Sequence, residues 1–206
     1  AYEIAQCLVG SEMCIRDRSM SRFNGQNFAI CGKTIESLRR NVITLMPQWL
    51  EGIFSITERR SENKLIITSG GVTNSYYMFG GKDESSYTLV QGITLAGVLF
   101  DEVALMPRSF VEQAMARCSV AGSKFWFNCN PENPGHWFYV EWIKKARERN
   151  ILYLHFTMDD NLSLAPEIKA RYEGMYTGVF YRRYILGLWV KAEGLVYPMF
   201  DRSAHI

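Results

Sequence analysis

The sequence predicts an α/β protein whose core is a three-layer αβα sandwich around a mainly parallel sheet. Strand and helix patterns alternate from residue 96 to residue 157, which is typical of βαβ units. In this region the apolar run Gly97–Phe100 ends directly in Asp101 and Glu102, and one helix later the apolar run 125–127 ends in Asn128. Apolar strands with polar ends indicate a buried sheet with a ligand site at its carboxyl edge.

Length and composition allow one sizeable core, or one domain and the start of another. The chain has 206 residues, 48% of them hydrophobic, and a net charge of +2, which neither requires nor excludes nucleic acid. No apolar run approaches the roughly 18 residues of a membrane span, so no membrane partner is predicted. Cys31, Cys118 and Cys129 are scattered without CxxC spacing, which indicates reduced thiols in a cytosolic setting.

The N-terminal segment 1–18 is predicted to be foreign to the fold. Residues 8–18 resemble the translation of a transposase-type sequencing adapter, and such a scar belongs outside any argument about the fold. The native part of the chain is therefore expected to begin near Ser19, in the middle of a longer protein.

The first native elements are predicted to be one strand, one helix and then a set of strands. Residues 28–31 form a short buried-strand candidate. Apolar residues at three- and four-residue spacing from Ile35 to Trp49 predict an amphipathic helix, with Thr34 as its N-cap. Strands are expected at 53–57 and 64–68, paired across a charged turn, and a further strand runs through 76–79. A weak helix and a loop are expected over 84–97.

The later elements alternate as the fold class requires. Pro107 predicts a helix start, and the apolar face of that helix is expected to carry Val111, Ala114, Met115 and Cys118. Lys124–Asn128 is the next predicted strand. The next helix is expected to bury Trp137, Val140, Ile143 and Ala146, and a strand is expected at 151–157. A helical stretch from Pro166 to about Trp189 follows.

The pair Asp101 and Glu102 is the first candidate for catalytic chemistry. In P-loop nucleotidases the first acid of such a pair helps to hold Mg²⁺, and in the ATPase branch the second polarises the attacking water. The alternative is a structural role, in which one of the acids caps the turn before Pro107. The strand and its two acids do not by themselves separate these interpretations.

A complete phosphate-binding loop is absent from the sequence. Gly32-Lys33-Thr34 is similar to the end of Gly-x4-Gly-Lys-Ser/Thr, but Asn27 stands where the first glycine is required, and the residues between form a strand. Lys33 and Thr34 are therefore predicted to form a strand-to-helix turn near the site, as candidate nucleotide contacts.

Asn128 and Asn130 follow the second apolar strand. A right-handed crossover places consecutive parallel strands side by side, so Asn128 or Asn130 is expected close to Glu102. A polar residue at that place in ATPase motors senses the γ-phosphate and couples hydrolysis to movement. The alternative is turn chemistry, because 130–135 reads Asn-Pro-Glu-Asn-Pro-Gly, which forms turns on any fold.

Two further groups of charged residues are candidates for nucleotide or DNA contacts. Asp159 and Asp160 close the predicted strand 151–157, where they face the nucleotide or the DNA path, or simply cap a loop. The arginines Arg39, Arg182 and Arg183 are candidates for phosphate contacts, and a solvated helix face is the alternative for each of them.

Six segments in order resemble the large terminase subunit of tailed bacteriophages, in the PBSX-like group. They are residues 34–42, 92–97, 97–102, 130–138, 155–161 and 176–189, and the resemblance covers about residues 22–202. It implies an ASCE-type P-loop NTPase fold that is incomplete at its N-terminus. The implied domains are a partial ATPase domain at 19–163, a helical linker at 164–190 and the start of a nuclease domain at 191–206.

The resemblance also implies a function: an ATPase motor that couples Mg-ATP hydrolysis to packaging of phage DNA into the procapsid. Glu102 would be the catalytic carboxylate, Asp101 would hold Mg²⁺ through water, and Asn128 and Asn130 would lie at the coupling motif. The implied partners are double-stranded viral DNA, the portal protein, the terminase small subunit and further copies in a ring. The implied location is the host cytoplasm, transiently at the portal vertex of the procapsid.

The family's large subunits also carry an endonuclease, so the full-length protein is expected to cut DNA as well. Without the Walker A region and the nuclease domain, this chain alone is expected to be inactive. Two alternatives remain. One is a helicase-like or other P-loop translocase, and the other is a non-enzymatic nucleic-acid-binding module that uses Arg39, Arg40, Arg182 and Arg183.

Overall fold

The computed structural model describes residues 2–5, 18–46, 52, 54–161 and 164–191. The chain forms two compact units. The first unit comprises residues 1–129 and 137–155, and the second comprises residues 130–136 and 156–206. Each unit is described by itself. The predicted start of a nuclease domain at 191–206 lies almost wholly outside the described residues.

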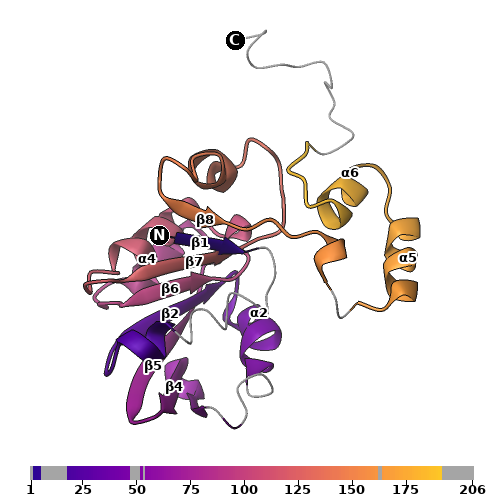
Figure 1. The fold of residues 1–206 in the computed structure, drawn as a ribbon. Helices are drawn as coiled ribbons and strands as arrows, with labels where there is room; N and C mark the ends of the chain where they lie inside the picture. Colours follow the sequence, from indigo (N-terminus) through magenta and orange to yellow (C-terminus); the bar gives the residue numbers. More distant parts are fainter. Residues whose placement is uncertain (1, 6–17, 47–51, 53, 162–163, 192–206) are drawn as a thin grey trace, which may run out of the picture. The chain divides into compact units, whose positions relative to one another are not determined.

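The first unit is built on an eight-stranded sheet in its described part, with the order β3-β4-β5-β2-β6-β7-β1-β8 (Figure 1). The strands are β1 (Tyr2–Ala5), β2 (Asn27–Gly32), β3 (Ser55–Arg59), β4 (Lys64–Ser69), β5 (Val72–Gly80), β6 (Gly97–Phe100), β7 (Lys124–Asn128) and β8 (Ile151–Tyr153). The hairpin strands β3 and β4 pair antiparallel, as do β4 and β5. All other neighbours pair parallel. The prediction of a mainly parallel sheet is therefore confirmed.

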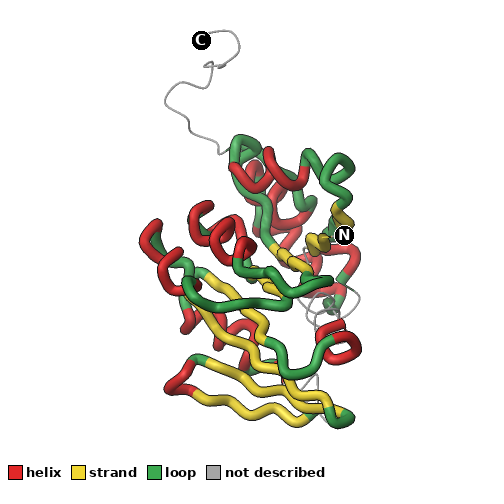
Figure 2. Tube along the Cα trace, turned by 90° about the vertical axis from the view of Figure 1, so that its left-hand side faces the viewer, coloured by secondary structure: helices red, strands yellow, loops and turns green. Residues whose placement is uncertain are grey.

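The helices are short (Figure 2). Several of them are 3-10 or π-helical. The first unit contains α2 (Ile35–Leu38), η1 (Arg39–Ile43), η2 (Arg60–Glu62), η3 (Glu84–Val90), η4 (Val103–Leu105), α4 (Arg108–Ala116) and η5 (Tyr139–Ile143). The second unit contains η6 (Met158–Asp160), α5 (Pro166–Met175), α6 (Gly178–Phe180) and η7 (Tyr181–Ile185). No described helix is long and apolar enough to cross a membrane.

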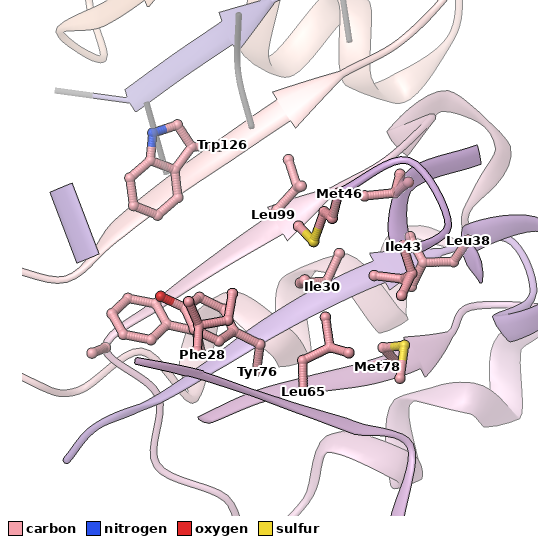
Figure 3. Close-up of a cluster of buried hydrophobic side chains, with 13 residues drawn as sticks. Phe28, Ile30, Leu38, Ile43, Met46, Leu65, Tyr76, Met78, Leu99 and Trp126 are labelled. Atoms are coloured by element: carbon pink, nitrogen blue, oxygen red, sulfur yellow. The ribbon is translucent and has the colours of Figure 1, made fainter. Parts of the chain in front are cut away.

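Each strand of the sheet contributes side chains to two layers of the fold, because successive side chains of a strand point to opposite faces of the sheet. On one face, Phe28 and Ile30 of β2 pack with Leu38, Ile43 and other residues of the α2–η1 segment (Figure 3). On the other face, Phe127 of β7 stacks on Phe100 of β6 and contacts the rings of Phe138, at the N-cap of η5, and Trp142, within η5. The helices therefore cover both faces, which confirms the three-layer prediction.

Several predicted elements differ from the observed ones in detail. The helix expected over 35–49 is a single α-helical turn followed by the π-helical η1, and Trp49 lies outside the described residues. In the helix expected to bury Trp137, Val140, Ile143 and Ala146, Ile143 is buried as predicted, but the other three are half-buried and Phe138 and Trp142 are buried instead. The wider π-helical turn of η5, with the Lys144 N–H bonded to the Tyr139 carbonyl, changes which residues share a face.

The strand predicted at 151–157 is shorter than expected, because β8 ends at Tyr153. Thr157 instead precedes the 3-10 helix η6 and accepts a backbone N–H as its cap. At the other end of the chain, residues 2–5 form β1, which pairs parallel with β7 and with β8. The interpretation of residues 1–18 as foreign sequence stays a prediction.

Gly97 opens β6 at a place where a side chain does not fit. A Cβ on Gly97 would lie 2.9 Å from the Trp126 ring and 3.0 Å from the carbonyl oxygen of Lys124. Gly97→Ala is expected to lower the free energy of unfolding by about 1–3 kcal/mol, as measured by urea denaturation. Gly174→Ala is the matched control, because no heavy atom lies within 4 Å of a Cβ there. Equal effects of the two substitutions would refute the packing argument.

Candidate active site

The acid pair lies at the carboxyl edge of the sheet, in a turn that directly follows β6. The Asp101 N–H donates to the carbonyl oxygen of Cys31 on β2, with 2.8 Å between N and O, so the backbone ladder continues one residue past the strand. Asp101 is buried, with 4% of its surface exposed, and Glu102 is half-buried. The fold thus places one carboxyl inside the protein and its neighbour at the boundary with solvent.

Asn128, the last residue of β7, contacts both acids. Its side-chain Nδ2 donates to Asp101 Oδ1 at 2.9 Å, and its Oδ1 accepts from the Glu102 N–H at 2.6 Å. The orientation of the amide follows from chemistry, because a carboxylate needs the donor and a backbone N–H needs the acceptor. The expectation that Asn128 lies close to Glu102 is confirmed.

Glu102 has an unusual backbone conformation, with φ of 58° and ψ of 52°. The left-handed region costs a non-glycine residue about 1–2 kcal/mol, and such residues cluster at active sites where the surrounding structure holds them. Here the hydrogen bond from the Glu102 N–H to Asn128 and the adjoining 3-10 helix η4 hold the turn. The strained residue is the predicted catalytic one.

Both carboxyl groups are easier to protonate than in water. Burial raises the pKa of Asp101, and the hydrogen bond from Asn128 partly opposes this. Burial also raises the pKa of Glu102, and the charge of Asp101 adds to the rise. A nearby cation would relieve both effects, since it favours the ionised forms.

The donor set fits Mg²⁺ bound together with a nucleotide rather than by protein alone. Protein sites usually hold Mg²⁺ through one or two carboxylates, several waters and substrate phosphates. Among the described residues there is no group of three His, Cys, Asp or Glu side chains that could hold a metal ion. Asp101 offers one carboxylate at the edge where a ligand of an open α/β sheet binds.

Lys33 and Thr34 follow β2 at the same edge, since Cys31 pairs in register with Phe100. Lys33 Nζ donates to the Lys82 carbonyl at 2.7 Å. Thr34 is the N-cap of α2, as predicted, and accepts from the Ser37 N–H. Their role as nucleotide contacts stays a prediction.

Arg39 lies on η1 and anchors the β3–β4 hairpin. Its Nε forms an ion pair with Glu58 at 3.0 Å, and its Nη2 donates to Asn63 at 3.0 Å. The structure thus gives Arg39 a structural set of partners, and its contact with phosphate stays a prediction.

The remaining candidates belong to the second unit. Asn130 is exposed. Asp159 forms an ion pair with Lys169, and Asp160 accepts the Thr157 N–H at 2.6 Å, which is a capping contact. Arg182 is exposed.

Arg183 is partly buried, in contrast to an arginine on a solvated helix face. Its Nη1 lies 3.3 Å from Glu132 Oε2, and its Nη2 donates to the Val190 carbonyl at 2.9 Å. It therefore ties the turn 130–136 to the end of the helical segment within the second unit.

The three described cysteines are predicted to be unreactive in the native protein. Burial raises the pKa of Cys118 and of Cys129 to about 12, and mainly burial raises the pKa of Cys31. Because the thiolate is the nucleophile, iodoacetamide at neutral pH should modify Cys118 and Cys129 on the order of 10³-fold more slowly in the native chain than in the unfolded chain. Peptide mass spectrometry measures each rate, and equal native and unfolded rates would contradict this.

Comparisons with known proteins agree with this arrangement. A family model described as terminase large subunit, T4likevirus-type, N-terminal, matches residues 19–204. The large terminase of a thermophilic bacteriophage, solved in complex with ADP, is 53% identical, with a TM-score of 0.88 over 98% of this chain and 52% of that one. The same terminase in complex with ATP-gamma-S is 52% identical, with a TM-score of 0.85 over 99% of this chain and 51% of that one.

A more distant structure shares the fold. The ATPase domain of the Thermus phage P74-26 large terminase is 15% identical, with a TM-score of 0.63 over 92% of this chain and 88% of that one. No curated protein sequence matches the chain.

The fold and the acid pair at its edge define the chain as an α/β core of the P-loop NTPase class. The chain belongs to the terminase large subunit family, in the N-terminal part of that protein. It spans about half the length of the two nucleotide-bound terminase structures it matches.

Proposed function

We propose that this chain is the ATPase core of a viral DNA-packaging motor. The observation that carries the proposal is the buried Asp101, bonded to Asn128 beside Glu102 at the carboxyl edge of the sheet. The large terminase it resembles was solved with ADP and with ATP-gamma-S, which supports nucleotide binding by this chain.

In the proposed reaction, Mg²⁺ supplies the positive charge that neutralises the β- and γ-phosphates. Asp101 would hold the hydrated ion, and Glu102 would orient the water that attacks the γ-phosphorus and accept its proton while the bond from the γ-phosphorus to ADP breaks. The raised pKa of Glu102 suits this task, because a general base works best with a pKa near the working pH. Asn130, one residue past Cys129, is proposed to pass the structural change that accompanies hydrolysis to the helical linker.

The phosphate loop is proposed to come from sequence outside these 206 residues. The chain contains no Gly-x4-Gly-Lys-Ser/Thr. We therefore propose that the chain is an interior piece of the gene, with its loop upstream of Ser19 and a nuclease domain beginning near residue 191. Asp159, Asp160, Arg182 and Arg183 are proposed to lie near the nucleotide or the DNA.

The partners, the location and the subgroup of the family are also proposals. Double-stranded DNA, the portal protein, the small subunit and further copies in a ring are the proposed partners, in the host cytoplasm and at the portal vertex. The PBSX-like group is supported by the six ordered segments, although the matched model is the T4-like one. Another P-loop translocase is the alternative, and an RNase H-like domain downstream of Ile206 would favour the terminase.

The test uses the longer protein, produced from a gene that carries the sequence on both sides of residues 19–206. It is expected to hydrolyse ATP with Mg²⁺, and double-stranded DNA is expected to change the rate. The 206-residue chain is expected to hydrolyse ATP far more slowly, since it lacks the phosphate loop. A longer protein with a Gly-x4-Gly-Lys-Ser/Thr loop and no ATPase activity would overturn the proposal.

A further inference from the structure

We propose that Asn128 is a positioning residue that fixes both acids of the site with the two ends of one side-chain amide. This role is distinct from sensing a phosphate, because its two contacts lie within the protein. Its importance for catalysis rests on the function proposed above, whereas the contacts themselves involve no nucleotide.

The chemistry of the site explains why an amide stands at residue 128. Asp101 Oδ1 needs a donor, and the Glu102 N–H needs an acceptor. An ionised aspartate offers acceptors alone, and a hydroxyl offers both functions on a single atom. An asparagine presents a donor and an acceptor on two atoms of one plane, so a single side chain serves both neighbours.

Burial makes the loss of either contact energetically costly. Asn128 and Asp101 are each 4% exposed, so neither side chain can exchange the contact for solvent without moving. A buried polar group that loses its partner pays its full desolvation cost. The pairing of β6 with β7, in register from Gly97 with Lys124 to Phe100 with Phe127, holds the two partners opposite each other.

The acceptor end of the amide acts on the backbone of Glu102. This residue lies in the left-handed region, and its N–H points to Asn128 Oδ1 at 2.6 Å. The hydrogen bond holds the peptide plane that ends in the Glu102 nitrogen, and it therefore restricts the direction in which the Glu102 side chain points.

Three variants of the 206-residue chain distinguish the role of the donor end of the Asn128 amide from the role of its acceptor end. Asn128→Ala removes both ends. Asn128→Asp keeps the acceptor for Glu102 and places a carboxylate against Asp101. The double variant Asp101→Asn with Asn128→Asp exchanges donor and acceptor and restores a matched pair. Asn133→Asp is the control, because it keeps the exposed acceptor that takes the Gly135 N–H at 2.8 Å.

Hydrogen exchange followed by NMR measures the acceptor end. The Glu102 amide is expected to exchange about tenfold faster or more in Asn128→Ala, and close to the parent rate in Asn128→Asp. Thermal unfolding measures the donor end: the double variant is expected to recover roughly half or more of the Tm lost by Asn128→Asp alone. Unchanged Glu102 exchange in Asn128→Ala, or no recovery in the double variant, would overturn the proposal.

Kinetics of the longer protein link the contacts to catalysis. Asn128→Ala is expected to lower kcat on the order of 10²-fold, since small displacements of catalytic groups have effects of this size, with a much smaller change in KM for ATP. A change confined to KM would mean that Asn128 only binds nucleotide. A longer parent protein without ATPase activity would refute the proposed function and leave the exchange and unfolding results standing.

Discussion

Replacing Glu102 by glutamine is expected to lower kcat for ATP hydrolysis in the longer protein by about 10²–10⁴-fold, the range that general-base catalysis contributes. Glutamine keeps the size of the side chain and cannot accept the proton of the attacking water. The Glu102 N–H would still donate to Asn128, so the turn is expected to keep its shape. Nucleotide affinity should change little, which a fluorescent-nucleotide titration would measure beside the kinetics.

Glu112→Gln is the matched control for this experiment. Glu112 lies on α4, exposed to solvent, and its carboxylate pairs with Arg108 at 2.6 Å. Loss of an exposed pair of this kind costs at most about 1 kcal/mol, and turnover should stay at the parent value. If Glu102→Gln and Glu112→Gln hydrolyse ATP equally well, Glu102 is not the base.

Replacing Phe127 by alanine is expected to lower the free energy of unfolding by about 3–5 kcal/mol, the usual cost of emptying a buried aromatic site. Phe127 has no exposed surface. Its ring stacks on Phe100 with centroids 5.2 Å apart, and it contacts Phe138 at 5.2 Å and Trp142 at 5.0 Å. Because Asn128 is the next residue, the cavity would also loosen the support of the acid pair. Urea denaturation followed by circular dichroism measures the loss.

Phe180→Ala provides the comparison, since Phe180 is 57% exposed and contacts the exposed ring of Tyr184. An exposed substitution of this kind is expected to change stability by less than about 1 kcal/mol. Similar losses for Phe127→Ala and Phe180→Ala would show that the aromatic cluster of the first unit is not a stabilising core.

The central elements were predictable because their signals are local. The apolar run before Asp101 and Glu102 indicated a buried strand, and Pro107 indicated a helix start. The adjacency of Asn128 and Glu102 followed from the handedness of a crossover connection. Each of these predictions depends on one segment or on one topological rule.

The details of the site were not predictable, because they depend on atoms from different strands. No pattern in the sequence indicates that Glu102 adopts a left-handed backbone, or that the two ends of the Asn128 amide serve two residues. The predicted buried face of η5 was right only at Ile143 for a similar reason, since a π-helical turn shifts the helical period that the prediction assumed. The available signal was an asparagine at the end of the strand next to the one that ends in Asp101 and Glu102. It indicated that Asn128 lies near the acids, but not which atoms are in contact.

The route of the chain after β7 has a mechanical consequence. Asn128 belongs to the first unit, and Asn130 is the first residue of the second unit, which the chain leaves again after His136. A single buried residue, Cys129, therefore connects the amide that contacts both acids to the other body, over a span of at most about 7 Å. A connection of this length leaves the backbone little freedom between Asn128 and Asn130. The coupling proposed for Asn130 would therefore act through the backbone of Cys129, toward the turn that Arg183 holds through Glu132.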